Sequence, residues 1–200
     1  TFLGSADLSG ESAWKHEGGN LWSYAGVLPS EACNLIFDDG NSFGNLRWEL
    51  SDLRRQGEWH YTHLGIAGNS VKPEEITAPE KLYLYSEKNP GAFYRQIECA
   101  LWSVNGMERR LAYGQHDIIL QDLCFKNGGV HGFQAIRPYN LTIRRCGFIN
   151  IGGATYDRKL RIRLGNGVEF WDSADDIQVT GCSFYEIYDS CVTHQGGKEC

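Results

Sequence analysis

The chain has 200 residues, 42% of them hydrophobic and 12% aromatic, a composition of ordered globular proteins that excludes an intrinsically disordered chain. The formal net charge of −6 argues against nucleic acid or an anionic membrane as a partner and leaves uncharged ligands such as carbohydrate open. The sequence has no run of about 18 apolar residues, so no membrane insertion is expected.

The first predicted elements, within residues 1–109, are short β-strands. The stretches "LRWEL", "EWHYTHLGI" and "KLYLYSE" alternate apolar and polar residues and are rich in aromatic side chains, which is typical of half-buried strands. Turn-forming residues fill the gaps between them, as in "DDGNSFGN" and "EKNPGAF". We therefore expect residues 1–109 to form an antiparallel β region that includes the first coil or cap of the domain after it.

Residues 110–200 contain a sequence repeat. The stretches "DIILQDLCFKN" (117–127), "NLTIRRCGFIN" (140–150) and "DIQVTGCSFYE" (176–186) follow one template of aliphatic, small and aromatic positions. Their starts are 23 and 36 residues apart, and a period in the twenties with strand-type alternation is typical of solenoids. A charged insertion, 154–166, accounts for the longer interval and is predicted to protrude from one coil.

Aligning the three copies predicts columns of side chains that stack on one another. Neighbouring strands lie about 4.8 Å apart, so an inward column brings like residues into contact. One column contains Phe125, Phe148 and Phe184, and another places Cys146 over Cys182. Because side chains in register point in parallel, the two cysteines are predicted to remain thiols.

This pattern resembles the right-handed parallel β-helix of pectate-lyase-like carbohydrate-active proteins, which include β-helical glycoside hydrolases. The resemblance covers residues 110–197, and the stretches "GEWHY" and "KLYLYSEKNP" before them resemble the entry region of such proteins. It implies an all-β fold in which a right-handed parallel β-helix follows an N-terminal antiparallel β region. A fold-level resemblance says little about function by itself.

The alignment also predicts which side chains face outward after the insertion. Strand alternation turns Gln134, Glu169 and Thr193 outward together, followed two residues later by Trp171 and Gln195. A carboxylate beside an indole suits a sugar, because sugar C–H faces pack on the ring while the acid exchanges protons with the glycosidic oxygen. The alternative is a Trp171 covered by the insertion and a merely solvated Glu169.

Glu169 is the leading candidate for a catalytic acid, with Asp172 or Asp189 as the second carboxylate. Glu169 and Asp172 lie three residues apart along a strand, about 10 Å between Cα atoms, which permits the wider carboxyl separation of inverting glycosidases. The alternative for Asp172 and Asp189 is an ordinary turn-forming aspartate.

Other polar residues of the same coils are candidates for substrate binding or proton transfer. His194 is a candidate for proton transfer, although a single histidine is more often structural. His131 and Arg137, with Gln134 and Gln195, are expected to line a polar substrate groove, and Arg137 suits a uronate carboxylate or, alternatively, corner carbonyls. No metal-binding spacing and no phosphate-binding motif occurs, so neither a metal nor another cofactor is expected.

These patterns together predict an extracellular or periplasmic carbohydrate-active protein. A glycoside hydrolase that cleaves a polysaccharide is favoured. Two alternatives stay open. One is a polysaccharide lyase acting on a uronate-containing glycan, with His194 or an arginine as the base. The other is a non-catalytic glycan-binding or structural β-helix, such as an adhesin or spike segment.

The ends of the sequence and its cysteines complete the prediction. The chain opens at Thr1 without the zones of a signal peptide, and its last repeat ends near Cys200 without a capping segment, so we expect an excised chain whose further coils follow Cys200. The seven cysteines form an odd set without a C-x-x-C pair, which favours core thiols, with one or two disulfides as the alternative.

Overall fold

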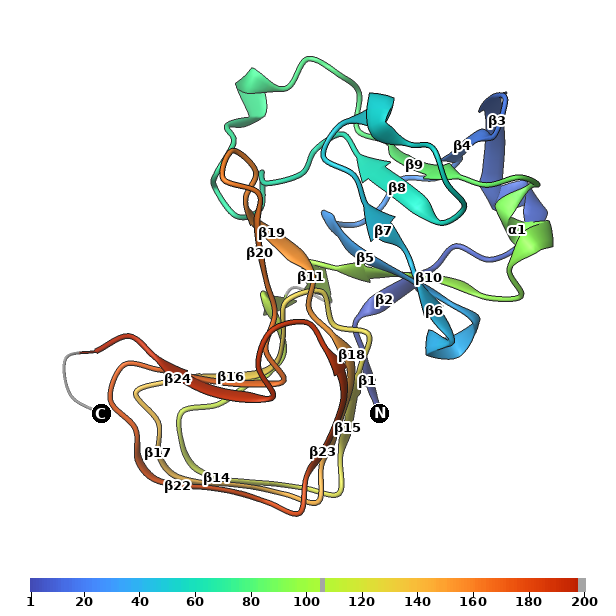
Figure 1. Cartoon of the computed structure of the whole chain (residues 1–200). Helices are drawn as coiled ribbons and strands as arrows, with labels where there is room; N and C mark the ends of the chain where they lie inside the picture. The colour runs from blue at the N-terminus through green and yellow to red at the C-terminus, as the bar shows by residue number, and fades with distance from the viewer. Residues whose placement is uncertain (105–106, 198–200) are drawn as a thin grey trace. The chain divides into compact units, whose positions relative to one another are not determined.

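A computed structural model of the chain describes residues 1–104 and 107–197, and it is an all-β protein with both parallel and antiparallel sheets (Figure 1). The chain divides into two compact units, which we name after their predominant strand pairing. The parallel unit comprises Thr1–Gly4, Ser103–Gly153 and Leu164–Cys200, and the antiparallel unit comprises Ser5–Trp102 and Ala154–Arg163.

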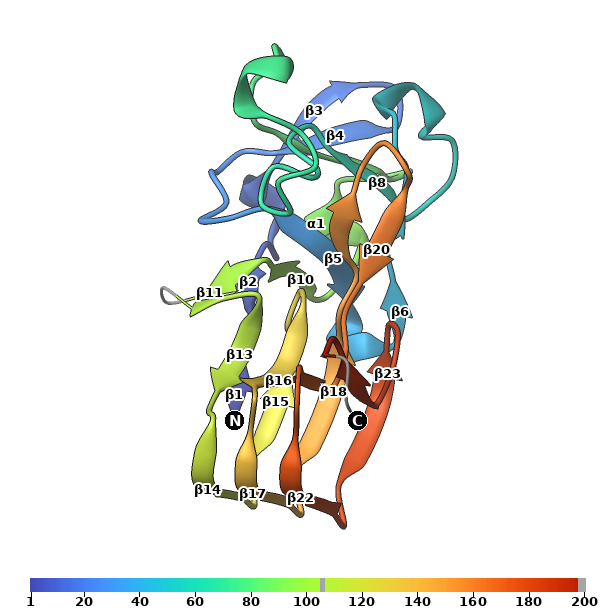
Figure 2. The ribbon, with the colours of Figure 1, turned by 90° about the vertical axis from the view of Figure 1, so that its left-hand side faces the viewer.

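The parallel unit contains three parallel sheets, and the chain passes through them repeatedly in the same order (Figure 2). One sheet has the order β1 (Phe2–Leu3), β15 (Cys124–Lys126), β18 (Gly147–Ile151) and β23 (Ser183–Ile187). The second has the order β13 (Arg110–Tyr113), β16 (His131–Ile136), β21 (Val168–Trp171) and β24 (Val192–Gln195). The third has the order β14 (His116–Gln121), β17 (Tyr139–Arg144) and β22 (Asp175–Thr180). A short antiparallel pair, β11 (Ser103–Val104) and β12 (Met107–Glu108), precedes β13.

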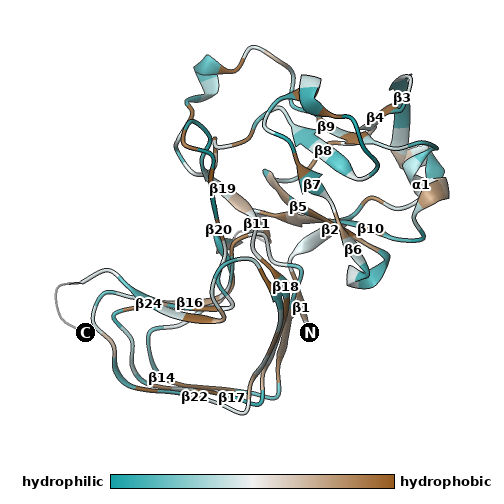
Figure 3. Ribbon diagram, in the orientation of Figure 1, coloured by the Kyte–Doolittle hydropathy of each residue, from teal (hydrophilic) through white to brown (hydrophobic). Residues whose placement is uncertain are grey.

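The predicted side-chain columns are confirmed by the strand register. Phe125 pairs with Phe148 and Phe148 with Phe184, with ring centroids 5.0 Å apart in both stacks. Leu141 and Ile143 of the third sheet are fully buried in the same core. Hydrophobic residues follow the sheet that carries the phenylalanines (Figure 3). Like residues therefore stack on like residues through the interior of the parallel unit.

Cys146, Cys182 and the start of the chain belong to the same stack. Every described cysteine is a free thiol, as predicted for Cys146 and Cys182. Strand β1, which the repeat did not predict, adds to β15 and places the ring of Phe2 5.2 Å from that of Phe125, nearly parallel to it. A segment far away in the sequence thus supplies one more member of the phenylalanine column.

Asparagines at the corners allow the chain to turn between sheets. Asn127 and Asn150 both have positive φ angles, 57° and 54°, in the left-handed region that asparagine tolerates better than most residues. The side-chain amide of Asn150 donates to the side-chain oxygen of Asn127 over 3.0 Å, and both are buried. The bond satisfies Asn150 Nδ2 and Asn127 Oδ1 at a buried corner, whereas Asn150 Oδ1 has no hydrogen-bond partner among the described residues.

The antiparallel unit is built from two sheets and a hairpin, with short helical turns between strands. One sheet has the order β2 (Ser5–Asp7), β10 (Ile97–Leu101), β5 (Ala32–Phe37) and β6 (Ser42–Phe43). The other has the order β3 (Trp14–Gly18), β4 (Leu21–Tyr24), β9 (Leu82–Tyr85), β8 (Glu58–Tyr61) and β7 (Asn45–Leu46). The helical segments are α1 (Pro90–Phe93) and the 3₁₀ turns Glu11–Ala13, Asp38–Gly40, Leu50–Asp52 and Pro73–Glu75.

The charged insertion forms a two-stranded hairpin, β19 (Ala154–Asp157) and β20 (Ile162–Leu164), most of which clusters with the antiparallel unit. The chain is therefore not one parallel solenoid, and the expected likeness to pectate-lyase-like proteins is wrong in this respect. The resemblance rested on the repeat alone, which covers only part of the chain, and the antiparallel strands in the rest agree with the antiparallel β region expected there. No helix among the described residues is long and apolar enough to span a membrane.

Candidate functional site

Glu169 lies in the predicted column with Gln134 and Thr193, yet its side chain is buried, with only 4% of its surface exposed. Gln134 Nε2 donates to Glu169 Oε1 over 2.7 Å, and Asn166 Nδ2 donates to Glu169 Oε2 over 2.8 Å. Both carboxylate oxygens are therefore occupied by amide donors. The prediction that Glu169 and Gln134 are open to solvent is wrong, because alternation fixes the face of a residue but not what covers it.

His131, predicted to line an open groove, is also buried. Its Nδ1 accepts the backbone N–H of Asn166 over 3.2 Å, and its Nε2 lies 3.4 Å from Glu169 Oε2. Burial lowers the pKa of His131 to about 3, and the charges of Arg109 and Arg110 act in the same direction. The imidazole is thus neutral at physiological pH, and with Nδ1 accepting a hydrogen bond its proton resides on Nε2, facing the carboxylate.

Two residues that sequence reasoning missed complete this buried cluster. Arg110 Nη1 donates to Gln134 Oε1, and its guanidinium lies 4.6 Å from the ring centre of Tyr113. Asn166 Oδ1 accepts the backbone N–H of Ser190 over 3.1 Å. The cluster links β13, β16, β21 and the turn before β24, so it fixes the spacing of successive strands. The sequence did carry a signal for Asn166. Val168 aligns with Phe133, and Asn166 lies two residues before Val168, just as His131 lies two residues before Phe133.

A second group of predicted residues lies together on the surface. Trp171 shares a column with Ile136 and Gln195, and 40% of its surface is exposed. Asp172 follows it with a φ of 66°, which turns its carboxylate toward Arg137, whose Nε donates to Asp172 Oδ2 over 3.1 Å. The side chain of Arg137 is 74% exposed.

His194 and the chain after it border the same residues. The register puts His194 beside Phe170, and its Nε2 contacts the backbone carbonyl of Asp172. Gly196 has a φ of 74°, and a Cβ there would lie 2.8 Å from the indole of Trp171, so only glycine allows the backbone this close. We define the Trp171 surface as the exposed residues Arg137, Trp171, His194 and Gln195 together with the partly buried Asp172.

Asp189 does not join either group. It is exposed in the turn between β23 and β24, where its backbone N–H donates to Gly165 O over 3.0 Å. No hydrogen bond or ion pair joins its carboxylate to another described residue. This arrangement agrees with the turn-forming alternative more than with a second catalytic carboxylate.

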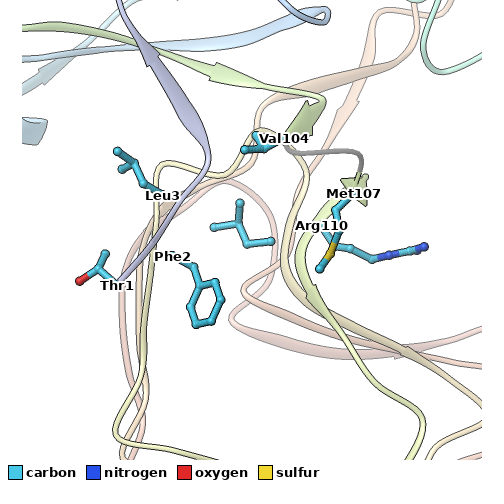
Figure 4. A pocket seen from close by; sticks show the side chains of 7 residues that line it. Thr1, Phe2, Leu3, Val104, Met107 and Arg110 are labelled. Carbon is cyan, nitrogen blue, oxygen red and sulfur yellow. The ribbon is translucent and has the colours of Figure 1, made fainter.

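The parallel unit also has a cavity of about 430 Å³ beside β1 (Figure 4). Its lining is mostly apolar, with Phe2, Leu3, Val104, Met107 and Leu111 among its residues. Thr1 and Arg110 are the polar residues of its lining. Among the described residues, no cluster of three or more histidine, cysteine or acidic side chains is placed to hold a metal ion.

Comparison with known proteins gives no family assignment. No protein-family model matches the sequence, and no curated protein or solved structure matches it significantly. The pectate-lyase-like resemblance has no support from these comparisons and is withdrawn.

Proposed function

We propose that this chain is a carbohydrate-active protein and that the Trp171 surface binds a polysaccharide. The observation that carries the proposal is the indole of Trp171, which is partly exposed between charged and amide side chains. Sugars are bound in this way because their C–H faces pack on aromatic rings while neighbouring polar groups accept and donate hydrogen bonds to the hydroxyls.

Arg137 supports an acidic glycan in particular. Of its guanidinium nitrogens, only Nε has a partner among the described residues, Asp172, so the remaining N–H groups face solvent. A guanidinium binds a carboxylate through two parallel hydrogen bonds, a geometry that a uronate provides and a neutral sugar does not. We therefore propose a uronate-containing polysaccharide as the preferred ligand.

Binding is better supported than paired-carboxylate hydrolysis. Glu169 would have to release Gln134 and Asn166 before it could reach a glycosidic oxygen, and Asp172 is already paired with Arg137. The second candidate function is uronate lyase activity. It is favoured by the position of His194 next to Asp172, within one group with Arg137, which would neutralise the uronate while His194 acts as the base.

The order of strands in the parallel unit supports a β-helical fold as part of this proposal. The chain passes β13, β14 and β15, then β16, β17 and β18, then β21, β22 and β23, and returns to the same three sheets each time. Parallel crossover connections are right-handed in nearly all proteins, so we propose a right-handed helix. We also propose an extracellular or periplasmic compartment, where a polysaccharide ligand would be met.

The test is a binding assay against uronate-containing and neutral polysaccharides, using affinity electrophoresis and calorimetry. Trp171→Ala is expected to weaken binding by about tenfold or more, because the stacking contact is lost. The matched control is Tyr139→Ala, since Tyr139 is a similarly exposed aromatic residue of the parallel unit on a different sheet. Equal losses in the two variants, or no binding by the parent, would contradict the proposal.

Lyase activity is tested on any polysaccharide that binds. A lyase forms a double bond that absorbs in the ultraviolet, a hydrolase releases reducing ends without that absorbance, and a binding protein does neither. His194→Gln should abolish the ultraviolet signal and keep binding. A signal that survives this substitution would remove His194 as the base.

A further inference from the structure

The antiparallel unit contains a cavity of about 370 Å³ that is lined by the hairpin of β19 and β20 and by the loop between β8 and β9. Its volume falls within the usual range of small-molecule sites. Two apolar and five charged residues line this hairpin cavity: Val71, Ile76, Glu49, Glu75, Arg158, Lys159 and Arg161.

The hairpin and the loop are fixed to each other by direct contacts. The backbone N–H of Arg158 donates to Ser70 Oγ over 3.1 Å, and Arg158 Nη1 donates to Thr62 O over 3.3 Å. A Cβ at Gly68 would lie 2.8 Å from the carbonyl oxygen of Thr155, so the loop approaches the hairpin as closely as glycine allows. The walls of the cavity are therefore positioned without a ligand, which lowers the cost of binding one.

The charged residues of the cavity differ in whether they have a partner. Lys159 Nζ lies 3.6 Å from Glu75 Oε2, and Arg158 is bound to the loop. Glu49 and Arg161 line the same cavity, yet neither side chain forms a hydrogen bond or an ion pair with any described residue. Two opposite charges thus remain available at one cavity without neutralising each other.

Arg161 also has an unfavourable backbone conformation. Its φ is 58°, and its backbone N–H donates to Arg158 O over 3.3 Å to close the hairpin turn. A residue with this φ in a hairpin turn is usually glycine, so an arginine there costs stability. Arg137 and Arg145 share the conformation, but each is paired with an aspartate. A strained residue whose charge is unpaired at a cavity indicates a role in binding.

We infer that the hairpin cavity binds an α-amino acid with a branched apolar side chain. Arg161 donates two parallel hydrogen bonds to the α-carboxylate, and Glu49 accepts hydrogen bonds from the α-ammonium group. Val71 and Ile76 contact the apolar side chain. A ligand that lacks one of the two charges would leave Glu49 or Arg161 without a partner. The inference is independent of the proposed glycan binding, because no residue of the Trp171 surface lines this cavity.

The experiment measures binding of L-leucine to the whole chain by isothermal titration calorimetry. Two analogues each remove one charged group: isocaproate lacks the ammonium, and isoamylamine lacks the carboxylate. We expect L-leucine to bind about tenfold or more tightly than either analogue, because each charge-assisted contact contributes to affinity. No binding of L-leucine at millimolar concentration, or equal affinities for the three compounds, would overturn the inference.

Variants assign the two charged groups of the ligand to their partners. Arg161→Gln should weaken L-leucine binding about tenfold or more and leave isoamylamine unaffected, whereas Glu49→Gln should weaken L-leucine similarly and leave isocaproate unaffected. The control is Arg55→Gln, an exposed arginine of the same unit outside the cavity lining, which should change neither affinity. An equal loss in Arg55→Gln would mean that net charge, and not a positioned guanidinium, binds the carboxylate.

Arg161→Gly separates binding from folding. Glycine adopts the positive φ without strain, so this variant should lose L-leucine binding while its midpoint of thermal unfolding rises. Binding that survives in Arg161→Gly would remove Arg161 as the carboxylate partner. A lower midpoint would show that the arginine serves the hairpin instead, and the inference would fall.

Discussion

The two units of this chain are both built from β-strands, but their cores are organised by different rules. In the parallel unit a core residue contacts its equivalent one strand away, as in the column of Phe125, Phe148 and Phe184. In the antiparallel unit the largest buried side chains, Trp59 and Tyr61, belong to one strand and have no repeated equivalents. The residues of a periodic core can be predicted from their spacing in the sequence, whereas those of an aperiodic core cannot.

Buried polar groups follow the same division. In the parallel unit they pair with groups at equivalent or nearby positions of the next strand, as Asn150 with Asn127 and Gln134 with Glu169. In the antiparallel unit the buried carboxylate of Glu31 accepts backbone N–H groups from Gly65 and Ala67, which belong to a distant loop. The first arrangement supports a repeat, and the second holds one irregular loop in place.

The largest expected effect tests the phenylalanine column. Phe148→Ala is expected to lower the free energy of unfolding of the parallel unit by about 3–5 kcal/mol, because the ring is fully buried between two others and its loss leaves a cavity. Hydrogen exchange of the β18 amides against denaturant measures this loss directly.

The matched control is Phe2→Ala at the end of the same column. Phe2 is 45% exposed and stacks on one ring only, so its removal should cost about 1 kcal/mol. Similar losses at Phe2 and Phe148 would mean that position in the stack does not determine the contribution of a ring, and the comparison between the two units would lose its basis.

The sequence predicted those parts of the molecule in which residues in contact on adjacent strands are separated by the interval of the sequence repeat. The columns through Phe148 and Cys146, and the register of Glu169 with Gln134, follow from aligning three stretches. The outward side of Trp171 and Gln195 was predicted by the same counting.

Burial of Glu169 and His131 was not predictable by that counting. Alternation assigns a side to each residue, whereas burial depends on Asn166 and Arg110, which lie outside the aligned stretches and reach over the carboxylate and its amide partner. Strand β1 was missed for a related reason. Its two residues are too few to show a repeat, and their pairing with β15 is explained only by the end of the phenylalanine column, on which Phe2 stacks.

The next largest effect concerns Glu31, the buried carboxyl of the antiparallel unit. Burial raises the pKa of Glu31 to about 7, against the opposing hydrogen bonds from Gly65, Ala67 and Ile66 and the charge of Arg158. The folded state therefore holds its proton more tightly than the unfolded state, whose pKa is near 4.5. Stability from this group is fully present below pH 4.5 and is lost as pH rises through 7, by about 3 kcal/mol.

Unfolding followed by tryptophan fluorescence measures the stability of the antiparallel unit at each pH, because five of the six tryptophans lie in that unit. Glu31→Gln mimics the protonated carboxyl and should remove the decline, so that parent and variant diverge increasingly between pH 4.5 and 7. If the stabilities of parent and variant changed by the same amount between pH 4.5 and 7, Glu31 would not be titrating in that interval, and the loop with Gly65 and Ala67 would not depend on its protonation.

The smallest expected effect on stability is at the Trp171 surface, where Arg137→Gln removes an exposed ion pair with Asp172. Exposed pairs contribute about 0.2–1 kcal/mol and are screened by salt, so the unfolding free energy should change by no more than that. The effect on ligands should be selective, because the loss of a guanidinium weakens uronate binding and leaves a neutral polysaccharide stacked on Trp171.

The measurement is the ratio of the two affinities in the parent and in Arg137→Gln, with Arg144→Gln on β17 as the control for a general loss of positive charge. A uronate affinity that falls equally in both variants would mean that net charge, and not a positioned guanidinium, attracts the glycan. A stability loss well above 1 kcal/mol would instead show that Arg137 serves the fold, and the surface would then resemble the buried Glu169 cluster in role.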